Sequence, residues 1–181
     1  MARVTLHNAT FEPFIPEAEL ASAIARVAAD IAKAYAGRSP LFVAVLNGSY
    51  FFAAQLLNGL PLECAITFVK VASYHGTSST GQVTELIGLG GGIEGRDVIV
   101  LEDIVDTGNT LEHIMNNLVL LRPASIAVAT MLFKPDAYRK DIPVDHVAMR
   151  IPDHFVVGSG LDHDGLGRNL PGLYRIVTQH Q

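Results

Sequence analysis

The sequence predicts an α/β protein built on an open, mostly parallel sheet that is flanked by helices. Continuous apolar runs at 41–46, 98–101 and 125–133 suit strands that are buried on both faces. Helical patterns lie between these runs, and strands that alternate with helices imply parallel pairing through right-handed crossovers. A length of 181 residues fits a single domain spanning residues 1–181.

Each element has a local signal. Pro16 and two acids open a run of apolar residues, spaced by three and four from Leu20 to Tyr35, that predicts a helix ending at Gly37. After the strand 41–46 we expect a helix through 51–57 and a strand at 65–73. The strand 98–101 precedes a helix at 111–121. Shorter strands are expected at 146–151 and 155–157, after the strand 125–133.

Composition excludes several classes of protein. The formal net charge is -5 and Lys and Arg form no run, so a nucleic-acid surface is not expected. No apolar stretch approaches the roughly 18 residues of a membrane span, and the start lacks an apolar signal core, which favours the cytoplasm. The single cysteine, Cys64, can form no internal disulfide, and we expect it to be buried and inert within the apolar run 64–71.

The most informative stretch is 98–111, an apolar strand followed by two acids and a small polar turn that runs into a helix. The turn consists of Asp106, Thr107, Gly108, Asn109 and Thr110. Amides at a helix N-terminus, the helix dipole and threonine hydroxyls together favour a phosphate group, and the glycine permits close approach. The alternative is that Asp106 or Thr107 merely caps the helix.

The two adjacent acids, Glu102 and Asp103, are costly to bury without a partner. The vicinal hydroxyls of a ribose or a magnesium ion would satisfy them. Because successive side chains of a strand point to opposite faces, both acids can serve one ligand only if the strand ends there. We therefore expect the strand to end at this pair. The alternative is that both carboxylates are simply solvated.

The whole stretch resembles the phosphoribosyl-diphosphate signature of type I purine phosphoribosyltransferases. Four further segments agree: 46–54 resembles the pyrophosphate loop of that family, 72–81 resembles its catalytic lid, and 151–162 and 168–171 resemble the purine-binding hood of its hypoxanthine-guanine members. The matches run in order from about Leu41 to Pro171. The resemblance implies the family fold, with a core at about 38–145 and a hood built from the N-terminal residues and about 146–181.

The resemblance also implies roles for the residues that bind the sugar and phosphate. Glu102 and Asp103 would hold the ribose hydroxyls and Mg²⁺, while the turn 106–110 would cradle the 5-phosphate. Asp106 would act as a general acid or base at purine N7. Asp162 would border the purine pocket and hold a second Mg²⁺ on the pyrophosphate.

The base and the leaving group have implied partners of their own. Lys134 would donate to the purine 6-oxo group, Phe155 would stack on the base, and the backbone of Val156 would read the purine edge. The implied pyrophosphate contacts are the amides of Asn47 and Gly48 together with Arg168, and the implied lid residues are Ser73 and Tyr74.

Some positions depart from the family pattern. Asn47 and Asn109 stand where some relatives have Lys, and Ala137 and Tyr138 stand where others have basic residues. Some family members hold the peptide before the pyrophosphate loop in the cis form, so a cis bond between Leu46 and Asn47 is a hypothesis.

The implied reaction is the Mg²⁺-dependent transfer of phosphoribosyl from 5-phosphoribosyl 1-diphosphate to hypoxanthine or guanine, with IMP or GMP and pyrophosphate as products. The alternatives are another base such as xanthine or adenine, a sensor of the phosphoribosyl ligand without turnover, and a plain interaction module. Lys134 argues against adenine, whose exocyclic group is a hydrogen-bond donor. The expected partners are these small molecules and a second copy of the chain, in dimers or tetramers, without nucleic acid or membrane.

Overall fold

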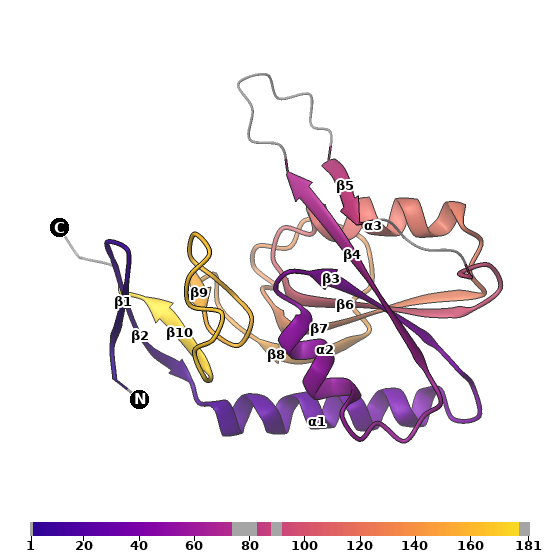
Figure 1. Ribbon diagram of the computed structural model, residues 1–181, viewed down its shortest axis with the longest axis horizontal. Coiled ribbons are helices and arrows are strands. Elements are labelled where there is room, and N and C mark those ends of the chain that lie inside the picture. The colour runs from indigo at the N-terminus through magenta and orange to yellow at the C-terminus, as the bar shows by residue number, and fades with distance from the viewer. Residues whose placement is uncertain (1, 74–82, 88–91, 178–181) are drawn as a thin grey trace.

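The computed structural model describes residues 2–73, 83–87 and 92–177. Its larger sheet (Figure 1) has the order β5 (Val83–Ile87), β4 (Ala65–Ser73), β3 (Leu41–Leu46), β6 (Asp97–Val105), β7 (Ser125–Phe133) and β8 (His146–Arg150). The five strands from β4 to β8 are parallel, and β5 pairs with β4 antiparallel. The predicted open, mostly parallel sheet is confirmed.

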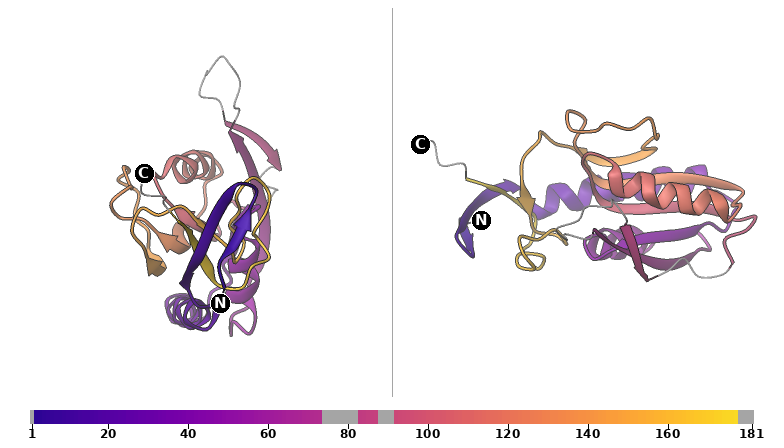
Figure 2. Two further views of the ribbon diagram at one scale, coloured as in Figure 1. Left: turned by 90° about the vertical axis from the view of Figure 1, so that its left-hand side faces the viewer. Right: turned by 90° about the horizontal axis from the view of Figure 1, so that it is seen from above.

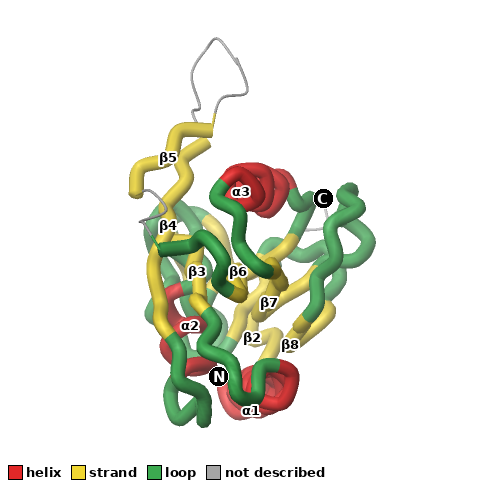
Figure 3. The backbone as a smooth tube through the Cα atoms, turned by 90° about the vertical axis from the view of Figure 1, so that its right-hand side faces the viewer, coloured by secondary structure: helices red, strands yellow, loops and turns green. Residues whose placement is uncertain are grey.

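Helices cover both faces of this sheet (Figure 3). The first two, α1 (Glu17–Ala34) and α2 (Tyr50–Leu57), lie on one face, and α3 (Asn109–Leu120) lies on the other. Side chains of β3 alternate accordingly: Phe42 and Ala44 pack into the core on the α1 and α2 side, whereas Val43 and Val45 pack into the core on the α3 side. Burial on both faces explains why the strand 41–46 reads as a continuous apolar run.

A smaller sheet has the order β1 (Val4–Leu6), β2 (Ala9–Ile15), β10 (Leu173–Ile176) and β9 (Val156–Val157). It lies at one end of the molecule, close to both described termini (Figures 1 and 2). We call this sheet and the loops 158–172 the hood. The strands at 4–6, 9–15, 83–87 and 173–176 were not predicted from the sequence.

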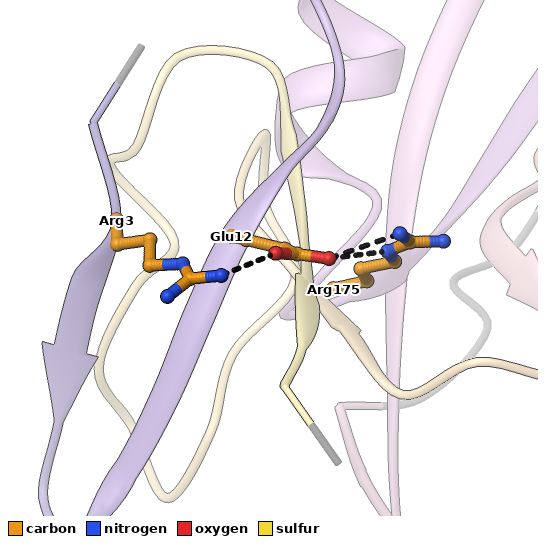
Figure 4. A network of polar contacts seen from close by, with 3 residues as sticks. All are labelled: Arg3, Glu12 and Arg175. Carbon is orange, nitrogen blue, oxygen red and sulfur yellow. Dashed lines mark hydrogen bonds and ion pairs between the residues drawn. The ribbon is translucent and has the colours of Figure 1, made fainter. Parts of the chain in front are cut away.

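Charge pairing holds the two ends of the chain together in the hood (Figure 4). Glu12 on β2 accepts hydrogen bonds from Arg3, at 3.1 Å, and from Arg175 on β10, at 2.9 and 3.1 Å. These bonds, first from Arg175 and then from Arg3, hold the pKa of the Glu12 carboxyl below its ordinary value.

Two local expectations were wrong. Cys64 is exposed, because β4 begins one residue later, at Ala65. Strand β6 does not end at Glu102 and Asp103 but continues to Val105. Its ladder with β3 nevertheless stops at Leu101, so both acids lie beyond the last pairing with β3.

Within the described ranges, none of the helices combines the length and the apolar character that a bilayer span requires.

Candidate functional site

A cavity of about 360 Å³ lies at the carboxyl ends of β3 and β6, where the N-terminus of α3 begins. This is the edge at which open parallel sheets bind ligands. The cavity brings together most of the predicted site residues: Asn47, Gly48, Glu102, Asp103, Asp106, Thr107, Gly108, Asn109, Thr110, Asp162 and Arg168.

The turn 106–110 leads from β6 into α3. Gly108 is the N-cap of α3 and has a φ of 88°, a left-handed conformation that favours glycine. Among the described residues, no side-chain hydrogen bond caps this helix end. Its first amides therefore remain available to an anion, which agrees with the phosphate site predicted from the sequence.

The acid pair, Glu102 and Asp103, lines the cavity. Glu102 is buried, and its Oε1 has no hydrogen-bond partner among the described residues. Burial first, and then the charge of Asp103, raise the pKa of Glu102 well above its ordinary value. Burial likewise raises the pKa of Asp103 to about 6, although backbone amides and the charge of Arg168 favour its ionised form.

The loop that follows β3 packs directly on this pair. The peptide bond between Leu46 and Asn47 is cis, as hypothesised. At Gly48 a Cβ would overlap the carboxylate of Asp103, so the absence of a side chain lets the loop backbone approach the acid. The hood closes on the same loop, because a Cβ at Gly160 would overlap the carbonyl oxygen of Gly48.

The hood contributes one ion pair to the cavity. Arg168 Nη2 lies 2.7 Å from Asp162 Oδ1, and Arg168 Nη1 donates to the carbonyl of Gly160 at 2.6 Å. The other carboxylate oxygen of Asp162 accepts the Gly165 amide at 2.7 Å. In this state each of the two charged groups is already partnered.

The register of three parallel strands places Lys134 beside two acids. Val105, Phe133 and Arg150 are aligned on β6, β7 and β8, so the residues that follow these strands meet at one edge. There Lys134 Nζ donates to Asp106 Oδ2 at 2.8 Å and to Asp153 Oδ1 at 2.9 Å.

Burial opposes the charge of Lys134, but the bonds to Asp106 and Asp153 outweigh it and raise the pKa of the ammonium. The same contact lowers the pKa of Asp153. Asp153 was not singled out from the sequence. Its only signal there is its position in the segment 151–162.

A family model described as phosphoribosyl transferase domain matches residues 16–164. The chain belongs to this family. The hypoxanthine-guanine phosphoribosyltransferase of Staphylococcus aureus is 38% identical to it over 167 residues, which are 92% of this chain and 93% of that protein. The protein of the same name from Streptococcus agalactiae is 46% identical over 138 residues, which are 76% of this chain and 77% of that protein.

Solved structures agree with this phosphoribosyltransferase assignment. A crystal structure of a hypoxanthine phosphoribosyltransferase from Staphylococcus aureus matches with a TM-score of 0.86 at 37% identity, covering 92% of this chain and 91% of that one. A hypoxanthine-guanine phosphoribosyltransferase structure from Bacillus anthracis matches with a TM-score of 0.85 at 34% identity, covering 92% and 97%. The fold is the type I phosphoribosyltransferase fold that the resemblance implied.

Three other predicted residues of the phosphoribosyltransferase, Lys134, Phe155 and Val156, do not line this cavity. Phe155 is 47% exposed, and its ring contacts those of Phe11 and His163 at centroid distances of 6.2 and 5.6 Å. It lines a second cavity of about 380 Å³ together with Asp153. Val156 is buried in β9. Lys134 forms a hydrogen bond with one acid of each cavity. Asp106 lines the first cavity and Asp153 lines the second.

Only the edge of the predicted lid can be placed. Ser73 is the last residue of β4. Tyr74 and the rest of the lid, up to residue 81, lie outside the described residues.

The acid pair fits a magnesium ion, because both acids line the same cavity although β6 continues past them to Val105. Glu102 offers a buried carboxylate oxygen without a hydrogen-bond partner among the described residues, and Asp103 lies next to it. No cluster of three or more metal-binding side chains occurs in the described part of the chain. Mg²⁺ is commonly held by one or two carboxylates, water and substrate oxygens, so two acids suffice when the substrate supplies the rest.

Proposed function

We propose that this phosphoribosyltransferase moves the phosphoribosyl group of 5-phosphoribosyl 1-diphosphate to hypoxanthine or guanine, giving IMP or GMP and pyrophosphate in purine salvage. The observation that carries the proposal is the shared cavity: the buried Glu102 and the half-buried Asp103 lie beside the phosphate turn, and Asp106 of that turn is bonded to Lys134. The matching relatives bear the name of this activity.

The sugar and its phosphate bind to carboxylates and to the backbone in this proposal. Glu102 and Asp103 hold the ribose hydroxyls and Mg²⁺, and the turn 106–110 binds the 5-phosphate through its amides and hydroxyls. Bound Mg²⁺ supplies positive charge that stabilises the pyrophosphate leaving group. Because four acids line the cavity, Glu102, Asp103, Asp106 and Asp162, such positive charge is needed for an anionic substrate.

The transfer breaks the bond from ribose C1 to pyrophosphate and forms the bond from C1 to the purine nitrogen. As positive charge develops on the sugar, the neighbouring carboxylates stabilise it. Asp106 accepts or donates the proton at purine N7. Its hydrogen bond to Lys134 fixes the position of its carboxylate.

Lys134 selects the base, in our account, by donating to the 6-oxo group. Phe155 stacks on the ring, the backbone of Val156 reads the purine edge, and Asp162 borders the base. The half-exposed ring of Phe155 supports this role. Xanthine shares the 6-oxo group and is the second candidate base, whereas adenine presents a donor to the ammonium.

The leaving pyrophosphate meets the amides of Asn47 and Gly48 and the guanidinium of Arg168. Asp162, which is paired with Arg168, is the proposed ligand of a second Mg²⁺. Ser73 and Tyr74 of the lid close over the reacting groups and exclude water.

We further propose a single functional domain for residues 1–181, with a core at about 38–145 and a hood from the N-terminal residues and about 146–181. The cytoplasm is the proposed location, and dimers or tetramers are the proposed assembly. The only other partners in this proposal are the small-molecule substrates.

Pyrophosphate release tests the proposal. Purified protein is incubated with phosphoribosyl diphosphate, Mg²⁺ and one base at a time: hypoxanthine, guanine, xanthine or adenine. The control reactions contain EDTA. Release that needs both the metal and a 6-oxopurine supports the proposal. If no base reacts while phosphoribosyl diphosphate raises the Tm, the chain is a sensor of that ligand.

A further inference from the structure

The segment that follows Lys134 packs against the phosphate turn from outside the cavity. A Cβ at Gly108 would lie 2.5 Å from Tyr138 Cε2 and 2.7 Å from Lys140 Cγ. The backbone joins as well, because the Arg139 amide donates to the Thr107 carbonyl at 3.3 Å. We call residues 138–140 the strap.

Lys140 ends the strap in an ion pair with α3. Its Nζ lies 2.7 Å from Glu112 Oε2, and the two side chains are 21% and 47% exposed. Glu112 belongs to the first turn of α3, and its amide donates to the carbonyl of Gly108. The pair thus connects the strap to the first turn of the helix that begins at the phosphate turn.

The charges near the phosphate turn 106–110 determine what the ion pair between Lys140 and Glu112 does for anion binding. Among the described residues that line the cavity, Arg168 is the only cation, and it is paired with Asp162. A carboxylate in the first turn of a helix competes with a bound anion for the positive end of the dipole. Glu112 therefore opposes a phosphate at the turn unless its charge is balanced.

We propose that Lys140 is a positioning residue of the phosphate turn: it neutralises Glu112 in the first turn of α3, next to Gly108. This inference rests on the proposed function, in which the turn binds the 5-phosphate. Lys140 touches no reacting atom and acts through the charge of Glu112. It strengthens binding of the sugar phosphate and leaves the base and the chemical step unchanged.

The test compares Lys140→Ala, Lys140→Arg, Glu112→Gln and the double variant Lys140→Ala/Glu112→Gln. Arg122→Ala is the matched control, because Arg122 forms a similar ion pair with Glu94, at 2.8 Å, beyond the other end of α3. Each variant is checked for folding by its Tm. The KM for phosphoribosyl diphosphate, the KM for hypoxanthine and kcat are then measured separately.

Lys140→Ala raises the KM for phosphoribosyl diphosphate by about fivefold, as expected for one uncompensated charge near a dianion in water. The KM for hypoxanthine and kcat stay within about twofold of the wild type, and so do all constants of Lys140→Arg, Arg122→Ala and the double variant. An unchanged KM in Lys140→Ala overturns the inference. So does a double variant as impaired as Lys140→Ala, because the defect is then one of packing.

Failure of the proposed function is distinguished from failure of this inference, because the wild type then forms no nucleotide. In that case the same variants are compared by the concentration of ribose 5-phosphate that gives half of the full Tm shift. A wild-type midpoint in Lys140→Ala, or no shift in any variant, overturns the inference.

Discussion

Lys134 Nζ lies 2.8 Å from Asp106 Oδ2, so the side chain that we assign to the purine 6-oxo group is bonded to the side chain that we assign to the N7 proton. The 6-oxo group and N7 are neighbours on the same edge of the purine ring. A base that reaches both side chains must approach in one orientation. With these assigned roles, we expect the same ion pair to couple recognition of the base to proton transfer.

Asp106→Asn tests the proton-transfer role. Asparagine still accepts a hydrogen bond from Lys134 but cannot exchange a proton with N7, so we expect kcat to fall by about 10²-fold or more with a small change in KM. Steady-state kinetics with hypoxanthine measures both constants. Wild-type turnover would remove Asp106 from this role.

Lys134→Ala tests base selection. Without the ammonium, the site loses its donor to the 6-oxo group, and the preference for hypoxanthine over adenine in kcat/KM falls by about tenfold or more. Lys33→Ala, in the last turn of α1, is a control for the loss of one positive charge. An unchanged ratio in Lys134→Ala shows that another group reads the base.

Glu102→Gln tests the electrostatics of the acid pair. In the folded protein the pKa of Glu102 is raised well above 4.5, and that of Asp103 is raised from 3.8 to about 6. The folded state therefore binds protons more tightly than the unfolded state, and the pair's contribution to the free energy of unfolding decreases as the pH rises from about 4 through about 6.

In EDTA, the Tm of Glu102→Gln consequently rises relative to the wild type as the pH increases from about 5 to about 7, by several °C. In separate assays with Mg²⁺, the transferase activity of the variant is lower than that of the wild type throughout this pH range, because the metal and ribose ligand is lost. Tm curves of wild type and variant that remain parallel across this range contradict the assignment.

Asp162→Asn tests the second metal site. The substitution weakens the pair with Arg168 and removes a negative ligand, so half-maximal activity requires more Mg²⁺. A magnesium titration of initial rates, at fixed phosphoribosyl diphosphate, measures the change. Superimposable titrations of wild type and variant exclude Asp162 as a metal ligand.

Local patterns predicted the core of the fold and much less of the hood. The spacing of apolar residues from Leu20 onward predicted which face of the helix is buried. The continuous apolar composition of 41–46 predicted a strand that is buried on both faces. Strands β2 and β10 pair residues that are far apart in sequence, such as Glu12 and Arg175. Such pairing has no local signal, which is why both strands were missed.

The candidate site likewise has a part that could be predicted from local sequence and a part that depends on the fold. The acids and the turn 102–110 are contiguous, so their chemistry could be predicted from one segment. Asp153 reaches Lys134 only through the parallel register of β7 and β8. Tyr138 and Lys140 reach Gly108 through a fold of the chain after β7. Neither contact follows from the spacing of residues.

The most direct test of the central claim is a single competition reaction. Hypoxanthine, guanine, xanthine and adenine are mixed at equal concentration with phosphoribosyl diphosphate, Mg²⁺ and the protein, and the nucleotides formed are separated by chromatography. Our account predicts IMP and GMP as the main products, and no nucleotide when EDTA is present. Formation of AMP at a comparable rate, or turnover that is indifferent to EDTA, would contradict it.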